Sequence, residues 1–288
     1  MKPTRRIRKH LVPALALIAL SAAVASPARA DGGPSSPLDW KPCAQGSDDA
    51  LGGELDRAGA RCAELTVPLD HSKPGGRTIT LALSRLPATD RAHRIGTMVL
   101  NNGGPGESAL GMPLQTRAAM KDVAARYDLV GLDPRFVGRS TSLDCGRPIG
   151  LWLRSAGPTR ARFDHQVKVA KDLAERCARR HADVLPYANT RDTARDIDLV
   201  RRVLGERRIS FLGYSYGSYL GAVYTQMFPG RTDRVVLDSA GAPNEWCPKR
   251  RRAPRTRRNA HCAAGRPGPP NATAPMASAP PPPACSPP

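Results

Sequence analysis

Short apolar segments alternate with helical patterns along most of the chain. The strand-like segments lie near Thr66 and at Thr78–Leu86, Thr97–Asn102, Tyr127–Leu132, Ile209–Leu212 and Arg234–Leu237. After the first pair they alternate with stretches of helical spacing. In one of these, from about Asp192 to Leu204, Ile197, Val200 and Leu204 share a face. The alternation predicts an α/β fold with a mostly parallel sheet and helices on both faces.

One of these strand-to-helix transitions carries a candidate nucleophile. The run Ile209–Leu212 leads into Gly213-Tyr-Ser-Tyr-Gly217, and a helical pattern continues to Met227. A G-x-S-x-G sequence between a strand and a helix is typical of a tight turn that exposes a strained catalytic serine. The sequence therefore predicts Ser215 as a nucleophile. The alternative is a glycine-rich turn with an incidental serine.

A second glycine-rich turn follows the strand at Thr97–Asn102. Ser108 is in position to cap the next helix, which we expect to run to about Ala125. A serine hydrolase needs backbone N–H groups aimed at the oxyanion of its tetrahedral intermediate. We expect one from Tyr216, after the nucleophile, and the other from Gly103 or Gly104.

A dinucleotide-binding fold is the rival interpretation of this second turn. Its strand, glycine-rich turn, helix and later acidic residue, Asp133, would suit such a fold. However, Gly103 to Ser108 does not spell G-x-G-x-x-G, and Pro105 removes an N–H group that a phosphate would need. We therefore favour the hydrolase interpretation.

Together these motifs resemble a known family. The matching pieces are Cys62–Asp70, Asn101–Gly106, Tyr127–Arg135, Thr190–Gly205, the turn around Ser215 with Phe228 and Pro229, and Arg234–Ser239. They are similar, in order, to the secreted tripeptidyl aminopeptidases and proline iminopeptidase-like serine peptidases of the α/β-hydrolase superfamily. The resemblance implies acyl transfer on a peptide with a free N-terminus. One departure is Phe136, where the family usually carries glycine.

The remaining triad members have no clear counterpart. The superfamily order is Ser, then Asp or Glu, then His. After Ser215 the chain offers only Asp233, Asp238, Glu245 and His261, and none has a convincing context. We expect the triad acid and histidine, the last two core strands and the lid to be missing, so that residues 31–246 form a partial hydrolase domain.

The C-terminal segment, residues 247–288, differs sharply from the rest. It holds no acidic residue and is rich in Arg, Pro and Ala. We hypothesise that a frameshift near Trp246 in a G+C-rich gene produced a disordered tail, which the other two reading frames would test. The competing interpretation is a genuine basic extension that binds anionic polymers.

The net charge of +19 is concentrated at the two ends. The first thirty residues contribute +6 and the C-terminal segment +8, which leaves +5 for the domain between them. That domain lacks the basic face with interleaved aromatic residues that nucleic-acid recognition needs. We therefore expect no nucleic-acid partner for it.

The N-terminus is predicted to be a secretory signal. A cationic start precedes the uncharged stretch Leu11–Ala25, and Ala28-Arg-Ala30 fits a cleavage site after Ala30. The stretch is short for a bilayer span, so we expect a secreted protein without a membrane anchor. Arg5 and Arg6 are compatible with twin-arginine export.

Export makes disulfides feasible. We expect the pairs Cys43–Cys62 and Cys145–Cys177, which the family resemblance also implies. Cys247, Cys262 and Cys285 remain unassigned in the C-terminal segment.

No Cys/His spacing resembles a zinc site, and we expect no metal or cofactor. The two hypotheses are a secreted serine aminopeptidase and a catalytically inactive remnant of one.

Overall fold

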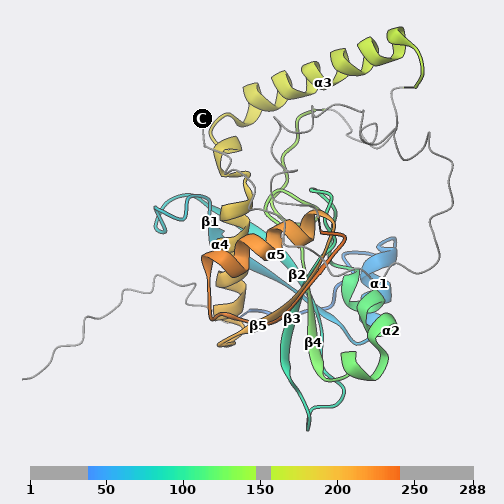
Figure 1. The fold of residues 1–288 in the computed structure, drawn as a ribbon, viewed down its shortest axis with the longest axis vertical. Coiled ribbons are helices and arrows are strands. Elements are labelled where there is room, and N and C mark those ends of the chain that lie inside the picture. Colours follow the sequence, from blue (N-terminus) through green and yellow to red (C-terminus); the bar gives the residue numbers. More distant parts are fainter. Residues whose placement is uncertain (1–37, 147–156, 241–288) are drawn as a thin grey trace, which may run out of the picture. The chain divides into compact units, whose positions relative to one another are not determined.

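The computed structural model describes residues 38–146 and 157–240, which contain one six-stranded sheet (Figure 1). The strands are β1 (Arg61–Pro68), β2 (Thr78–Leu86), β3 (Gly96–Asn101), β4 (Tyr127–Leu132), β5 (Ile209–Tyr214) and β6 (Thr232–Asp238). Every strand expected from the sequence is present. The predicted signal segment, 1–30, and the basic segment, 247–288, lie outside the described residues.

The strand order is β1-β2-β4-β3-β5-β6. β1 pairs with β2 and β2 with β4 in antiparallel fashion, whereas β4, β3, β5 and β6 run parallel. Nearly every residue of β3, β4 and β5 is buried, as expected for parallel strands covered on both faces. The mostly parallel sheet predicted from the sequence is therefore confirmed.

Helices cover both faces of this sheet (Figure 1). The described helices are α1 (Ala50–Arg57), α2 (Met112–Ala124), α3 (Arg160–His181), the short 3₁₀ helix η1 (Leu185–Tyr187), α4 (Thr190–Val203) and α5 (Tyr216–Met227). Helix α3 extends away from the sheet (Figure 1). Ile197 of α4 and Leu220 of α5 share one buried cluster with Val99 of β3. Leu100, the next residue of β3, packs in a second cluster with α1 and α2.

Helix α5 packs against the sheet at two glycines, where a side chain would not fit. A Cβ atom added at Gly221 would come 2.5 Å from the ring of Phe211. One added at Gly217 would come 2.6 Å from the carbonyl oxygen of Asn101. Glycine at these two positions therefore allows the close approach of α5 to the sheet.

Two details differ from the sequence-based expectations. Ser108 does not cap α2, because that helix begins at Met112 after an N-cap at Gly111, and the Ser108 hydroxyl donates to Asp133 instead. Helix α1 has no counterpart in the expected elements. Of the apolar residues of α3, Leu173 is buried, whereas Phe163 and Val167 are about half exposed.

Among the described residues no helix has the length and apolar character that a membrane crossing needs.

Both expected disulfides are present. Cys43 bonds to Cys62 on β1, and Cys145 bonds to Cys177 on α3. The first closes a loop with a sequence separation of 19 residues. It fixes the segment that precedes α1 to the outer strand of the sheet.

The double variant Cys43→Ser/Cys62→Ser should lower the free energy of unfolding by about 3 kcal/mol, because the unfolded chain regains the entropy of a closed loop. Urea unfolding followed by circular dichroism measures the change. A reducing agent opens both disulfides, so it should lower the free energy of unfolding of the unmodified chain by at least as much. A variant as stable as the parent would show that this disulfide does not constrain the unfolded state.

Candidate active site

Ser215 occupies the turn between β5 and α5. Its φ of 51° and ψ of −118° lie outside the regions that residues with a side chain normally adopt, so the backbone is strained there. The residue is exposed. Its N–H donates to the carbonyl of Asp238 at 3.0 Å, and its carbonyl accepts from the Ser218 hydroxyl at 2.6 Å. These bonds hold the strained turn between β6 and the first turn of α5.

The flanking glycines of this turn leave no room for side chains. A Cβ atom at Gly213 would lie 2.3 Å from the carbonyl oxygen of Gly217. The G-x-S-x-G spacing is therefore required sterically, and the turn has the geometry that the sequence predicts.

The loop after β3 meets this turn at Gly103. A Cβ atom there would lie 2.4 Å from the Tyr214 carbonyl oxygen and 3.2 Å from the Tyr216 amide nitrogen. Gly103 has a φ of +107°, which favours glycine. Gly104 is different, because its nearest neighbours belong to its own loop. Of the two expected oxyanion residues, Gly103 is thus the one that packs against the turn of Ser215.

Asp133 organises the loops around this junction. Its fully buried carboxylate accepts hydrogen bonds from the Ser108 hydroxyl at 2.7 Å and from the amides of Ala109 and Arg139 at 2.8 Å. A side chain at Gly138 would collide with it. Because the carboxylate is enclosed and occupied, it is not available for a ribose, which argues against the dinucleotide interpretation.

Phe136 adopts a left-handed backbone conformation, with a φ of +68°. A bulky residue is strained in this region, whereas glycine is not. This explains in physical terms why glycine is the usual residue at this point of the family pattern. The phenylalanine ring is partly buried against the core, and that contact offsets part of the strain.

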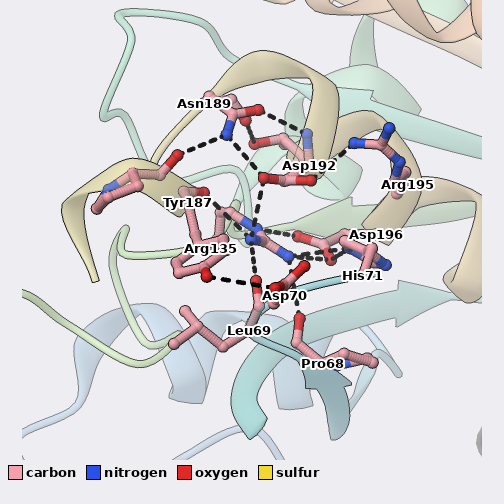
Figure 2. A network of polar contacts seen from close by, with 12 residues as sticks. Pro68, Leu69, Asp70, His71, Arg135, Tyr187, Asn189, Asp192, Arg195 and Asp196 are labelled. Atoms are coloured by element: carbon pink, nitrogen blue, oxygen red, sulfur yellow. Dashed lines mark hydrogen bonds and ion pairs between the residues drawn. The ribbon is translucent and has the colours of Figure 1, made fainter. Parts of the chain in front are cut away.

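Arg135, next to Phe136, is the centre of a buried polar network (Figure 2). Its guanidinium makes a two-pronged contact with Asp196, with both nitrogen–oxygen distances at 2.7 Å. It also donates to the carbonyls of Leu69 at 3.0 Å and Tyr187 at 3.1 Å. His71 Nε2 lies 2.9 Å from Asp196 Oδ1 and 3.0 Å from Arg135 Nη2.

The network fixes α4, and α4 in turn contacts the turn of Ser215. Thr190, the first residue of α4, has its hydroxyl 2.8 Å from the hydroxyl of Tyr216. Burial raises the pKa of the Tyr216 phenol, and the hydrogen bond with Thr190 opposes that rise. Sequence reasoning assigned no role to Arg135 or Asp196, although both lie in motifs that carry the family resemblance.

The part of the chain that the structure describes does not supply the other triad members. The described residues after Ser215 include no histidine. Asp233 forms an ion pair with Arg234, and Asp238 accepts from the Ser239 hydroxyl at 2.8 Å. Glu245 and His261 lie outside the described residues. Within residues 38–146 and 157–240 no three acidic, histidine or cysteine side chains are grouped as metal ligands would be.

Known proteins resemble this chain in sequence. The family model for the alpha/beta hydrolase fold matches residues 96–261. Tripeptidyl aminopeptidase of Streptomyces lividans is 39% identical over 215 residues, which is 72% of this chain and 39% of that protein. Serine protease Hip1 of Mycobacterium tuberculosis is 36% identical over 222 residues, which is 72% of this chain and 40% of that protein. This chain thus spans about two fifths of the length of these curated relatives.

Among solved structures, proline iminopeptidase of Mycobacterium smegmatis superimposes with a TM-score of 0.39 and 18% identity, over 71% of this chain and 56% of that one. A probable hydrolytic enzyme of Pseudomonas aeruginosa gives a TM-score of 0.37 and 16% identity, over 60% of this chain and 39% of that one.

Proposed function

Since this chain belongs to the α/β-hydrolase family, we propose that it is a secreted serine peptidase that uses Ser215 to release short peptides from free N-termini. Relatives named tripeptidyl aminopeptidase and serine protease support a serine hydrolase that acts on peptides. The observation that carries the proposal is the exposed, strained Ser215 packed against Gly103. A strained backbone conformation costs energy, and such conformations cluster at functional sites, so the strain favours a catalytic role for Ser215 over an incidental one.

The proposed reaction is acyl transfer. The Ser215 hydroxyl attacks the scissile carbonyl, loses its proton to a general base and forms a tetrahedral intermediate. The N–H groups of Tyr216 and Gly103, with Gly104 as the alternative, would stabilise the oxyanion. As the intermediate collapses, the general base returns the proton to the leaving nitrogen, and the C–N bond breaks. This releases the C-terminal part of the substrate as a free amine and leaves the N-terminal peptide as an ester of Ser215, which water then hydrolyses. The base and its acidic partner have no assigned residues.

Secretion is supported by independent features. The two disulfides within the described residues fit an oxidising compartment. The pattern of residues 1–30 supports cleavage of a signal peptide after Ala30. The expected partner is a peptide with a free N-terminus.

The alternative is a catalytically inactive relative with a basic tail that at most binds anionic polymers. It is favoured by the lack of a histidine among the described residues that follow Ser215. Without a base, most of the rate enhancement would be lost, and only substrate binding and the oxyanion contribution would remain.

Labelling with a fluorophosphonate probe distinguishes the two. We expect the full chain to be labelled at Ser215 and to hydrolyse a tripeptidyl chromogenic substrate, and we expect Ser215→Ala to abolish both. Ser47→Ala, which removes an exposed serine from a surface loop, is the matched control and should change neither. Absence of both labelling and turnover would favour the inactive relative. Turnover that survives in Ser215→Ala would contradict the role of Ser215.

A further inference from the structure

Strand β6 forms one edge of the sheet within the described residues. It is far more exposed than the other parallel strands, and the side chain of Val236, near its C-terminal end, is 49% exposed. An open edge strand presents unpaired N–H and C=O groups to which another strand can bind. β6 is therefore a candidate interaction surface.

The hydrogen bonds of β6 show which of its residues face the open edge. Val235 lies opposite Phe211 and Leu237 opposite Gly213 in the parallel ladder with β5. The Asp238 carbonyl accepts from the Ser215 N–H, so Asp238 faces β5. Because backbone groups of successive strand residues point to opposite edges, Val235 and Leu237 direct theirs outward. No described residue bonds to these groups.

The side chains of β6 have a self-complementary pattern. Arg234 and Asp238 lie two residues on either side of Val236, on the same face of the strand, and all three are exposed. If two copies of β6 pair in antiparallel fashion about Val236, Arg234 of each copy lies opposite Asp238 of the other. Val236 then lies opposite its own copy. Opposite charges and apolar residues in such positions stabilise strand pairs.

The backbone and the side chains select the same register. Pairing about Val236 places Val235 opposite Leu237 of the other copy, and these are the two residues whose backbone groups face outward. They would exchange hydrogen bonds, while the Arg234–Asp238 and Val236–Val236 positions would be the close, non-hydrogen-bonded pairs. A register centred on Val235 instead would set Arg234 opposite Val236 and Asp238 opposite Thr232, so that no opposite charges would face each other.

We propose that β6 pairs with β6 of a second copy of this chain, in antiparallel fashion about Val236, to give a two-fold dimer with a continuous sheet. Arg234 forms an ion pair with Asp233 in the single chain, but its side chain is 57% exposed and can turn towards the partner. The interface is small, so the dimer is weak and depends on concentration.

Charge exchange tests the register. Sedimentation equilibrium of the full chain should show a dimer, and Arg234→Asp or Asp238→Arg should each weaken it by roughly tenfold or more, because like charges then face each other twice. The double variant Arg234→Asp/Asp238→Arg restores opposite charges and should restore the dimer. Failure of the double variant to recover what each single variant loses would overturn the proposed register.

Val236→Lys places two like charges on the two-fold axis and should also give a monomer. Val123→Lys, at a valine on α2 that is 54% exposed, is the matched control and should remain dimeric. Circular dichroism verifies that each variant is folded. A chain that is monomeric at high micromolar concentration would overturn the proposal.

Hydrogen exchange identifies any other occupant of the edge. In a dimer, protection of the Val235 and Leu237 amides should rise with protein concentration. Protection that is independent of concentration would mean that a segment of the same chain, such as residues 241–288, covers β6, and this result would also overturn the proposal.

Discussion

Replacing Gly103 with alanine should slow fluorophosphonate labelling of Ser215 by about 100-fold or more, whereas Gly106→Ala should change it little. The two glycines lie in the same loop and have nearly the same φ, +107° and +108°. They differ in their surroundings. The added methyl group would collide with the Tyr214 carbonyl at Gly103 but would meet open space at Gly106.

The comparison therefore separates contact with the nucleophile turn from backbone strain. Displacing the loop at Gly103 would move a proposed oxyanion donor, and loss of one such donor typically costs 10²–10³ in rate. The second-order rate constant of labelling is the quantity to compare, with thermal unfolding as a check on folding. Equal effects of the two substitutions would indicate that strain in the loop matters and that its contact with the turn does not.

Arg135→Met should lower the free energy of unfolding by about 3–5 kcal/mol, enough to unfold a marginally stable domain. The substitution leaves the Asp196 carboxylate, 1% exposed, without its cationic partner, and it removes the donors to the carbonyls of Leu69 and Tyr187. An unpaired charge in such a place is costly because water cannot reach it.

Arg77→Met is the matched control for this prediction. Arg77 forms an ion pair with Asp183, but both side chains are more than half exposed, so its loss should cost less than about 1 kcal/mol. The double variant Arg135→Met/Asp196→Leu removes both buried charges and should recover part of the loss. Urea unfolding measures all three. Similar costs for Arg135→Met and Arg77→Met would show that burial does not govern the strength of the Arg135 network.

The sequence predicts the strands and the turn of Ser215 well because both depend on local patterns. Apolar runs indicate buried strands such as Tyr127–Leu132, and Gly213 and Gly217 indicate a tight turn in which a side chain would not fit. Long-range contacts have no such local signal in the sequence. The pairing of Arg135 with Asp196 joins residues 61 positions apart, and neither residue stands out from its neighbours in sequence.

Two further features depend on contacts between residues that are distant in sequence. Ser108 precedes a helical pattern and has the chemistry of a capping residue. However, its hydroxyl donates a hydrogen bond to Asp133, which directly follows β4. Gly103 and Gly104 are equivalent in sequence, and only the path of the loop shows which one contacts Tyr214 and Tyr216. In both cases a neighbour distant in sequence decides the role of the residue.

The bonds of Arg135 also bear on the order in which the chain can fold. Its guanidinium bonds to Pro68 and Leu69, more than 60 positions earlier in the chain, and to Asp196, 61 positions later. During synthesis this arginine therefore leaves the ribosome long before its main acceptor exists. Until Asp196 emerges, the Arg135 guanidinium lacks its carboxylate partner on α4. The polar network around Arg135 is thus completed only after α4 has been translated. Contacts that form so late are expected to slow unfolding more than they speed folding.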